Sequence, residues 1–283
     1  MIVVVTGAAG LLGSHVVRAL LAAGHDVRSV DLRFTKGADP ATVQADLRIF
    51  GEAVQALEGA AAVVHTAAIP RPTGRTSTAV FSTNVLAAYN VTEAALLHDV
   101  RRLVNASSVS VLGFPFNPRP IRLSYLPIDE EHPLAPQEAY ALSKQLTEEI
   151  ITAATRRSDL SALSLRMPWI QTRESFDGDV RHHRAEPTIG RANLWAYIDV
   201  RDAAHAVATA IDAPLAGHTA VYISAADTFM EEETQGLVEA NFGDTELRRS
   251  LTGHESLIDV TAATKLLGFR PEHSWRSYEM AVR

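Results

Sequence analysis

Two kinds of residue are absent or scarce in this chain of 283 residues, and each shortage excludes a class of function. There is no cysteine, so the chain has no disulfide framework, no thiolate nucleophile and no cysteine-ligated metal site. Basic residues are outnumbered, with 26 Lys and Arg against 33 Asp and Glu and a net charge of −7. Because no basic block offsets this charge, we expect no nucleic-acid partner.

Long hydrophobic runs are missing as well. No apolar stretch approaches the ~18–20 residues that a membrane span requires. The N-terminus is apolar but lacks the basic region that begins a signal peptide. We therefore expect a cytoplasmic protein without membrane contact, built as one large α/β domain with a smaller lobe.

The first residues of the chain form a pattern of strand, glycine-rich turn and helix. Residues 2–5, Ile-Val-Val-Val, predict a buried strand, and a helical pattern covers residues 11–23. Between them, Gly7 permits a tight turn, Gly10 lets the backbone approach a diphosphate, and Gly13 lets helix and strand pack closely. The helix N-terminus then favours negative charge. This GxxGxxG spacing predicts a dinucleotide-binding turn, with the cofactor against Gly7, Gly10, Leu11, Leu12 and Gly13.

An acidic residue after the second expected strand, 26–30, indicates which dinucleotide binds. Asp31 lies close to the offset from the glycines at which a carboxylate accepts hydrogen bonds from the adenosine ribose. The same negative charge repels a 2′-phosphate, which favours NAD. Arg33 would instead pair with a 2′-phosphate, so NADP remains open.

Strands and helices alternate along most of the chain. The expected strands are 2–5, 26–30, 41–45, 61–66, 101–106 and 160–166, and the expected helices are 11–23, 50–57, 78–98 and 137–156. This rhythm predicts the α/β class, with a doubly wound parallel sheet and helices on both faces. We assign residues 1–170 to an NAD(P)-binding domain and residues 171–283 mostly to a small substrate lobe, with 196–225 returning to the sheet.

Ligands of such sheets bind beyond the carboxyl ends of the strands, where further candidates lie. Asp46 and Leu47 would meet the adenine ring, unless Asp46 caps the following helix. Small residues that let the cofactor cross the strand tips are Thr66, Ala67 and Ala68. His65 is either a catalyst or a locally packed residue. Asn84 either holds the backbone near the nicotinamide ribose or is simply buried.

The residues suited to chemistry follow the strand 101–106 and open the helix 137–156. Tyr140 and Lys144 are four positions apart and share one helical face. An ammonium ion near the phenol, together with oxidised nicotinamide, would bring the pKa of the tyrosine from ~10 toward neutrality. The phenolate then takes the proton of a substrate hydroxyl while Ser108 holds the substrate oxygen. The alternative is a tyrosine and a lysine on a solvated helix face.

Several motifs together resemble the extended short-chain dehydrogenase/reductases, in particular the NAD-dependent epimerase/dehydratase family. They are TGAAGLLG at 6–13, Asp31, HTAA at 65–68, Asn84, SSVSVLG at 107–113, YALSK at 140–144, LRMP at 165–168 and YIDVRDAAHAV at 197–207. The resemblance spans essentially the whole chain and implies a Rossmann fold. It implies that Ser108 rather than Ser107 is the catalytic serine, that Lys144 binds the nicotinamide ribose, and that Pro168 flanks the nicotinamide.

The chain departs from the family pattern in three ways. Val109 and Ser110 stand where family dehydratases have an Asp-Glu pair, so dehydration is not expected. Leu112 replaces a usual tyrosine, which we expect to alter packing only. The chain is also short, which speaks against a bulky nucleotide-sugar substrate without excluding it.

Two variable segments offer substrate contacts. The proline-rich stretch 114–133 is expected to lie over the site as a semi-rigid lid, where Phe114 and Phe116 either touch substrate or seal the loop to the core. The segment 171–195 is either a solvated loop or a binder of an anionic sugar through its arginines. Its adjacent histidines, His182 and His183, suggest no third metal ligand. The expected substrate contacts are Ser107, Ser108, Arg173 and Arg191.

These observations predict an NAD(P)-dependent dehydrogenase that oxidises a secondary alcohol of a sugar or sugar derivative, with no metal. The alternatives are an epimerase that recycles NAD on a sugar or nucleotide sugar and, in a different class, a cofactor-sensing regulator without catalysis. We expect a homodimer formed through the helices 78–98 and 137–156, unless these faces contact only their own sheet. The expected dimer contacts are Leu86, Val91, Leu146 and Ile150.

Overall fold

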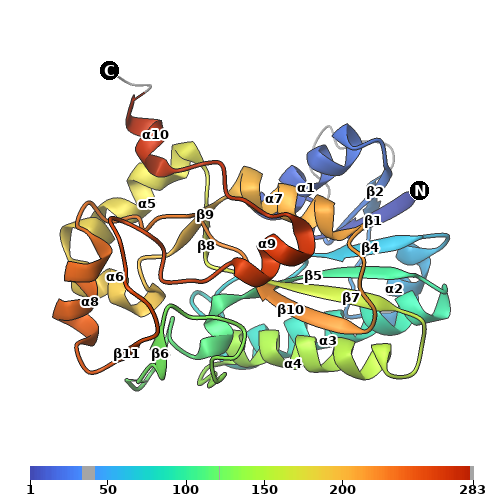
Figure 1. The fold of residues 1–283 in the computed structure, drawn as a ribbon. Coiled ribbons are helices and arrows are strands. Elements are labelled where there is room, and N and C mark those ends of the chain that lie inside the picture. The colour runs from blue at the N-terminus through green and yellow to red at the C-terminus, as the bar shows by residue number, and fades with distance from the viewer. Residues whose placement is uncertain (34–41, 121, 281–283) are drawn as a thin grey trace.

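A seven-stranded parallel sheet forms the centre of the protein. The structure is a computed structural model that describes residues 1–33, 42–120 and 122–280 (Figure 1). In spatial order the strands are β10 (His218–Tyr222), β7 (Ser161–Met167), β5 (Arg102–Ser108), β4 (Ala62–His65), β1 (Ile2–Thr6), β2 (Asp26–Asp31) and β3 (Thr42–Gln44). The strand order reverses between β1 and β4, which makes their carboxyl ends the topological switch point where ligands of this fold bind.

Helices cover both faces of the sheet because its strands are apolar on both sides. Val3 and Val5 face the helices α1 (Leu11–Ala22), α7 (Val200–Ala210) and α9 (Thr261–Leu267). Val4, between them, faces α2 (Phe50–Leu57), α3 (Ser77–Leu97) and α4 (Ala139–Thr155). Figure 1 shows these two layers on opposite sides of the strands. The predicted α/β class and doubly wound sheet are confirmed.

A second group of elements, drawn at the left of Figure 1, packs around its own apolar cluster. Its elements are η1 (Val109–Leu112), β6 (Tyr125–Leu126), β8 (Trp169–Gln171), α5 (Arg173–Ala185), α6 (Pro187–Gly190), η2 (Arg191–Asn193), β9 (Tyr197–Asp199), α8 (Thr234–Phe242), β11 (Glu246–Leu247) and α10 (Trp275–Met280). Two small parallel pairs, β8 with β9 and β6 with β11, join segments that lie far apart in the sequence.

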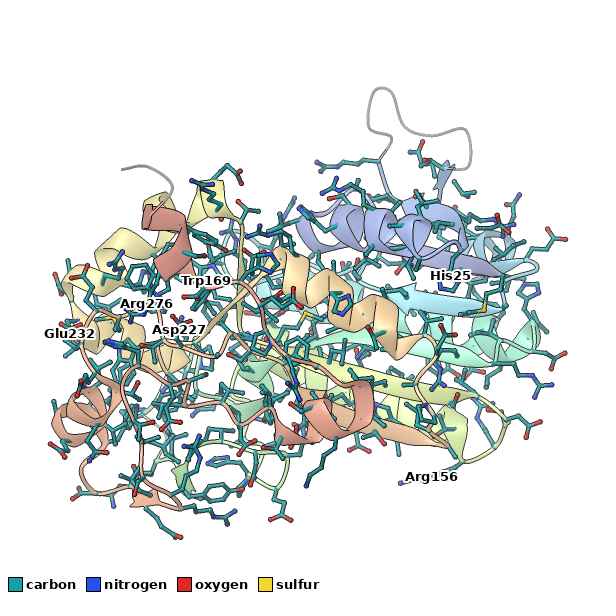
Figure 2. All side chains as sticks on the ribbon, turned by 45° about the horizontal axis from the view of Figure 1, so that its top comes forward. His25, Arg156, Trp169, Asp227, Glu232 and Arg276 are labelled. Atoms are coloured by element: carbon teal, nitrogen blue, oxygen red, sulfur yellow. The ribbon has the colours of Figure 1, made fainter. Side chains whose placement is uncertain are left out.

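One partly buried carboxylate links the C-terminal helix to this second group. Asp227 accepts hydrogen bonds from Tyr197 and Ser274, both at 2.7 Å, and lies 3.2 Å from Nε of Arg276. Figure 2 shows Asp227 and Arg276 together, near Trp169 and far from His25 at the other end of the sheet. The helix that begins at Trp275 is therefore held by side chains as well as by apolar contact.

The structure decides between the two alternatives given for one segment. Segment 171–195, for which a loop was one alternative, contains the helix α5. Farther along the chain, Ile258 forms an isolated bridge with Ile128. Within the described residues, no helix has both the length and the apolar character needed to cross a membrane.

The expected dimer contacts differ in their exposure. Val91 is fully buried against the sheet of its own chain, so its assignment to a dimer face is wrong. Leu86, on the same helix, is 44 % exposed, and Leu146 and Ile150 on α4 are partly exposed. These three residues remain available to a second copy of the chain, and the dimer stays a prediction.

Candidate active site

The glycine turn lies at the switch point between β1 and β4. Gly7 has a φ of +71°, and a Cβ atom there would lie 2.7 Å from the backbone nitrogen of Ala67. The chain after β4 crosses close over the turn because the Thr66 hydroxyl donates to the carbonyl of Thr6 at 2.7 Å. Thr66 and Ala67 therefore lie beside the turn. Passage of the cofactor over Thr66, Ala67 and Ala68 stays a prediction.

The other two glycines shape a cradle at the start of α1. A Cβ atom on Gly13 would lie 2.1 Å from the carbonyl oxygen of Gly7, and one on Gly10 would lie 3.1 Å from it. The first hydrogen bond of the helix runs from the N–H of Ser14 to Gly10, so the N–H groups of Leu11, Leu12 and Gly13 precede it. Gly10, as N-cap, offers no side-chain acceptor to them. This cradle fits the diphosphate of a dinucleotide.

Asp31 lies at the end of β2 beside the turn. One carboxylate oxygen accepts from the N–H of Ala9 at 3.0 Å, and the other accepts from the N–H of Arg33 at 3.2 Å. The carboxylate thus occupies the place expected for the ribose contact. The side chain of Arg33 is exposed, and the residues that follow it, 34–41, lie outside the described part of the chain.

The expected adenine contacts follow β3. The carboxylate of Asp46 accepts hydrogen bonds from Nε of Arg48 at 2.9 Å and from a terminal nitrogen of Arg48 at 2.5 Å. These bonds lower the pKa of Asp46. The N-cap of α2 is Ile49, so the alternative that Asp46 caps this helix is wrong. Leu47 is buried, and its carbonyl accepts from Asn90 at 2.9 Å. Contact of Asp46 and Leu47 with adenine stays a prediction.

The histidine at the end of β4 packs locally. His65 is 5 % exposed, and its Nδ1 lies 2.9 Å from the hydroxyl of Thr6. Burial lowers the pKa of His65 to about 3, and the positive charge of Lys144 acts in the same direction. The ring is therefore neutral near pH 7, which favours the structural alternative over catalysis.

Asn84 joins three elements below the site. Its side-chain oxygen accepts from the N–H of Ile69 at 2.7 Å, and its Nδ2 donates to the carbonyl of Ile69 and to the hydroxyl of Ser143, both at 3.1 Å. Asn84 thus fixes the backbone after β4 against the catalytic helix α4. Asn84 is thus buried and holds the backbone at Ile69, and its position near the nicotinamide ribose stays a prediction.

Three catalytic candidates meet at the end of β5. Ser108 ends this strand, and Glu138 caps α4 by accepting from two N–H groups at 2.6 Å, which places Tyr140 in the first helical turn. Lys144 follows one turn later, and its Nζ lies 5.8 Å from the centroid of the Tyr140 ring. The same nitrogen donates to the carbonyl of Ala106 at 2.6 Å. The tyrosine and the lysine are therefore not on a solvated face, since each is 8 % exposed.

The electrostatics of this group differ from the expectation. Burial raises the pKa of Tyr140 to about 12, and a hydrogen bond with Ser108 opposes this rise. Burial lowers the pKa of Lys144 to about 8, and the negative charge of Glu148 opposes this fall. The protein's own groups do not bring the phenol near neutrality, because the cost of burying its charge outweighs the hydrogen bond.

Ser107, an expected substrate contact, is buried and hydrogen-bonded to another side chain of the protein. Its hydroxyl donates to Oε1 of Glu148 at 2.6 Å, and the residue is 5 % exposed. The hydroxyl oxygen of Ser108 accepts from the N–H of Ser110 at 3.1 Å, and a hydrogen bond with Ser108 acts on the pKa of Tyr140. The choice of Ser108 over Ser107 as the serine that contacts substrate stays a prediction.

The two phenylalanines of the proline-rich segment have different environments. Phe114 is 3 % exposed and lies 5.8 Å from the ring of Phe242, so it seals the loop to the core. Phe116 is 50 % exposed, and its ring lies edge-on to Tyr140 at 6.4 Å between centroids. Its φ of +62° is strained for a residue that is not glycine. The proline-rich segment therefore places one exposed aromatic side chain beside Tyr140.

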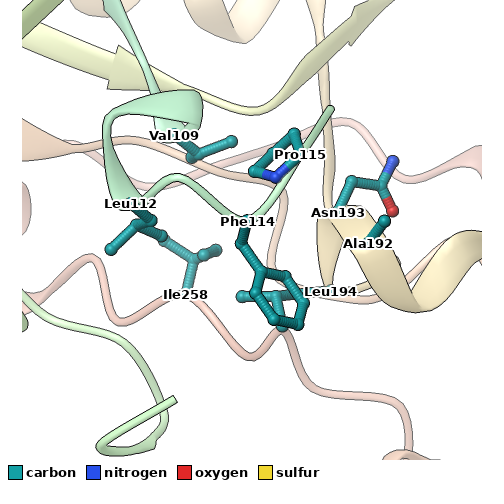
Figure 3. A pocket seen from close by; sticks show the side chains of 8 residues that line it. All are labelled: Val109, Leu112, Phe114, Pro115, Ala192, Asn193, Leu194 and Ile258. Carbon is teal, nitrogen blue, oxygen red and sulfur yellow. The ribbon is translucent and has the colours of Figure 1, made fainter. Parts of the chain in front are cut away.

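A shallow apolar depression lies between this segment and η2 (Figure 3). Its lining residues are Val109, Leu112, Phe114, Pro115, Ala192, Asn193, Leu194 and Ile258. Arg191 directly precedes this wall, and its guanidinium lies 5.5 Å from the ring of Phe242. Arg173 instead lies by the C-terminal helix, where it donates to the carbonyl of Tyr278 at 3.5 Å. The substrate contacts expected of both arginines stay predictions.

The remaining expected cofactor residue, Pro168, is buried directly after β7. Three residues around the site were missed at the sequence level: Glu138, Glu148 and Arg166. Glu148 had a usable signal, because it follows Lys144 at a spacing of four on the same helix face. Arg166 had no such signal. It lies within an apolar strand, and its pairing with Glu148 becomes visible only in the folded structure.

Comparisons with known proteins agree with this geometry. Residues 3–223 match the model of the NAD dependent epimerase/dehydratase family. The L-arabinose 1-dehydrogenase (NAD(P)(+)) of Haloferax volcanii is 34 % identical over 184 residues, which are 62 % of this chain and 71 % of that protein. A putative UDP-glucose 4-epimerase of Methanocaldococcus jannaschii is 32 % identical over 174 residues, 58 % of this chain and 54 % of the relative. The chain thus matches about half the length of that epimerase.

Solved structures share the fold over nearly the whole chain. A short-chain dehydrogenase/reductase superfamily protein from Agrobacterium tumefaciens, with bound NAD, superposes with a TM-score of 0.77 at 24 % identity and covers 99 % of this chain and 95 % of its own. A mutated uronate dehydrogenase superposes with a TM-score of 0.69 at 25 % identity and covers 99 % of this chain and 85 % of its own.

Proposed function

Because the chain belongs to the NAD-dependent epimerase/dehydratase family and is an NAD(P)-dependent enzyme, we propose that it is a dehydrogenase. The substrate is a secondary alcohol of a sugar or sugar derivative. The observation that carries this proposal is the meeting of Ser108, Tyr140 and Lys144 at the carboxyl edge of the sheet that holds the glycine cradle.

Ser108, Tyr140 and Lys144 each have a separate role in alcohol oxidation. Ser108 holds the substrate oxygen by a hydrogen bond, and the phenolate of Tyr140 takes the hydroxyl proton. The ammonium ion of Lys144 favours the phenolate and, as the family implies, also holds the nicotinamide ribose. NAD, when bound, would supply the acceptor for the hydride of the alcohol carbon; the substrate would then become a carbonyl compound, and its hydroxyl proton would stay on Tyr140.

The position of Asp31 supports NAD as the preferred form of the cofactor. Its carboxylate lies beside Ala9 of the glycine turn, where it accepts hydrogen bonds from ribose hydroxyls and repels a 2′-phosphate.

Two observations support a small sugar as the substrate. The exposed ring of Phe116 at Tyr140 offers an apolar face against which the C–H groups of a sugar ring can stack. L-arabinose 1-dehydrogenase and uronate dehydrogenase, by their names, act on sugars or sugar acids.

An epimerase is the second candidate, favoured by the match to UDP-glucose 4-epimerases. Such an enzyme uses the same three residues but returns the hydride to the other face of its intermediate, so no reduced cofactor accumulates.

Nucleotide analysis and substrate screening together test the proposal. We would first denature the purified protein and identify any nucleotide released, and then follow NADH formation with aldoses, uronic acids and nucleotide sugars. A dehydrogenase yields a largely empty site and net NADH with at least one free sugar. Stoichiometric NAD that survives purification, with interconversion of nucleotide sugars and no net NADH, would overturn the proposal in favour of the epimerase.

A further inference from the structure

A buried ion pair lies behind the catalytic group and has no part in the chemistry described so far. Glu148 and Arg166 are each 6 % exposed. The carboxylate accepts from Nε of Arg166 at 3.1 Å and from a terminal nitrogen at 2.7 Å. Burying such a pair costs desolvation free energy that its attraction barely repays, so stability alone does not explain its presence.

Glu148 and Lys144 on α4 bond to neighbouring residues of β5. Glu148 lies one helical turn after Lys144 on α4 and accepts a hydrogen bond from the hydroxyl of Ser107 at 2.6 Å. The residue before Ser107 is Ala106, whose carbonyl accepts from Nζ of Lys144 at 2.6 Å. The carboxylate therefore holds the strand segment to which the lysine is bonded, and it lies on the same helix face as the lysine.

The charge on Lys144 depends on its neighbours because the residue is only 8 % exposed. The titratable groups around it are Tyr140 and Glu148 from α4, His65 from β4 and Arg166 from β7. His65 is neutral near pH 7, and the coulombic effect on the pKa of Lys144 comes from Glu148 rather than from Arg166. Around the ion pair itself lie His218 of β10, Tyr222 and Glu130. Glu148 is thus the group that opposes the effect of burial on Lys144.

We propose that Glu148 is a positioning residue, whose carboxylate, fixed by Ser107 and Arg166, keeps Lys144 protonated and directed at Ala106 beside Tyr140.

This role has a kinetic signature that a structural role lacks. The active form of the pair has lost one proton, with Tyr140 as phenolate and Lys144 as ammonium. If Glu148 loses its charge, the lysine gives up its proton at lower pH. The midpoint of the rising limb of kcat/KM then moves to lower pH, and the plateau above it falls by the matching factor. A loosened fold lowers the plateau and leaves the midpoint in place.

The scarcity of lysine makes a direct titration possible. The chain contains three lysines, Lys36, Lys144 and Lys265, so a protein labelled with ¹³C at the ε carbon of lysine gives three signals. Lys144→Met identifies the signal of interest. The titration uses the protein without substrate, so its outcome does not depend on which sugar is oxidised or on whether the proposed function is correct.

In the wild type we expect Lys144 to titrate near pH 8, in line with its pKa of about 8. In Glu148→Gln we expect the midpoint lower by about one pH unit or more, and the plateau of kcat/KM lower by about tenfold or more. Glu148→Asp, which keeps the charge, should stay within ~0.3 pH units of the wild type. The matched control is Glu149→Gln, which removes an exposed charge from the next position and should shift Lys144 by less than ~0.2 pH units.

A second variant covers the case in which Glu148→Gln does not fold, because that change leaves Arg166 buried without its partner. Glu148→Gln combined with Arg166→Met replaces the pair by neutral side chains, and Lys144 should still titrate below the wild-type pH. The proposal is overturned if Lys144 titrates at the wild-type pH in whichever of these variants folds, or if the plateau falls without a shift in midpoint.

Discussion

Asp31 accepts a hydrogen bond from the backbone N–H of Ala9 at 3.0 Å, so the acid at the end of β2 is tied to the glycine turn after β1. Asp31→Ala removes both a ribose acceptor and the charge that repels a 2′-phosphate. We expect the Kd for NAD to rise about tenfold or more and the preference over NADP to shrink. Calorimetric titration with both nucleotides measures this.

The control for this variant is Asp26→Ala, at the exposed start of the same strand, which should leave both Kd values unchanged. Tighter binding of NADP than of NAD by the wild type would contradict the role given to Asp31.

The close packing at Gly13 predicts that this position does not tolerate a side chain. A second glycine, Gly51, serves as the control. A Cβ atom on Gly13 would lie 2.1 Å from the oxygen of Gly7, whereas one on Gly51 meets nothing within 4 Å. Gly13→Ala should abolish binding of NAD and lower Tm. Gly51→Ala, within the helix α2, should leave binding intact and change stability by about +0.5–1 kcal/mol. Retained NAD binding in Gly13→Ala would show that the cradle is not the cofactor site.

The pattern of the first thirteen residues predicts this turn, and the alternation of strands and helices along the chain predicts the sheet around it. The glycine turn and the strands and helices up to residue 167 depend on short-range periodicity, and their ends differ from the expectation by one or two residues. The pairing of β6 with β11 could not be predicted, because two-residue strands carry no periodicity. The pKa of Tyr140 was missed for a related reason, since burial depends on the assembled site.

Burial of His65 predicts a loss of stability in acid. The folded-state pKa of His65 is lowered from 6.5 to about 3, so its contribution to stability is complete above pH 6.5. As the pH falls from 6.5 toward 3, the unfolded chain binds a proton that the folded protein does not. The free energy of unfolding then decreases by ~1.4 kcal/mol per pH unit from this group alone. Urea unfolding at several pH values measures this slope.

His65→Gln should flatten that acid-side slope, while His205→Gln, an exposed histidine on α7, should leave it as in the wild type. An identical slope in His65→Gln and wild type would show that His65 is protonated in the folded protein.

Phe116 has a strained backbone and an exposed ring, so its replacement should affect stability and substrate binding in opposite directions. Phe116→Gly relieves the positive φ of 62° and should stabilise the protein by about 1 kcal/mol. It should also raise KM for the sugar about tenfold, because the stacking face at Tyr140 is lost. Phe116→Tyr should keep the wild-type KM. Phe50→Ala, an equally exposed aromatic residue on α2, is the control that should change neither value.

Orientation of the Phe116 side chain is a further feature that the sequence left open. Phe114 and Phe116 are two residues apart in one proline-rich segment, and nothing in the sequence distinguishes them. The buried site beside Phe242 accepts one ring, and the other remains at the surface next to Tyr140. An unchanged KM in Phe116→Gly would place the substrate away from this ring.

The pair of Tyr140 and Lys144 predicts how oxidation depends on pH. The base must be deprotonated, and the first proton leaves the pair with a pKa of about 8, that of Lys144 in the protein alone. The positive charge of oxidised nicotinamide lowers this midpoint further. The rate of oxidation should therefore fall as the pH is lowered below the midpoint, by about tenfold per unit. A kcat/KM that instead declines between about pH 6 and about pH 8 would contradict the assignment of the base.

The most direct test compares NADH formation by the wild type and by Tyr140→Phe with the best sugar substrate. The variant keeps the ring and its contact with Phe116 and loses only the hydroxyl that takes the proton. We predict net NADH from the wild type, in step with sugar oxidised, and a kcat lower by about 10²-fold or more in the variant with little change in the Kd for NAD. Equal rates in the two proteins would refute Tyr140 as the base, and NAD binding without turnover in the wild type would point to a cofactor-sensing regulator.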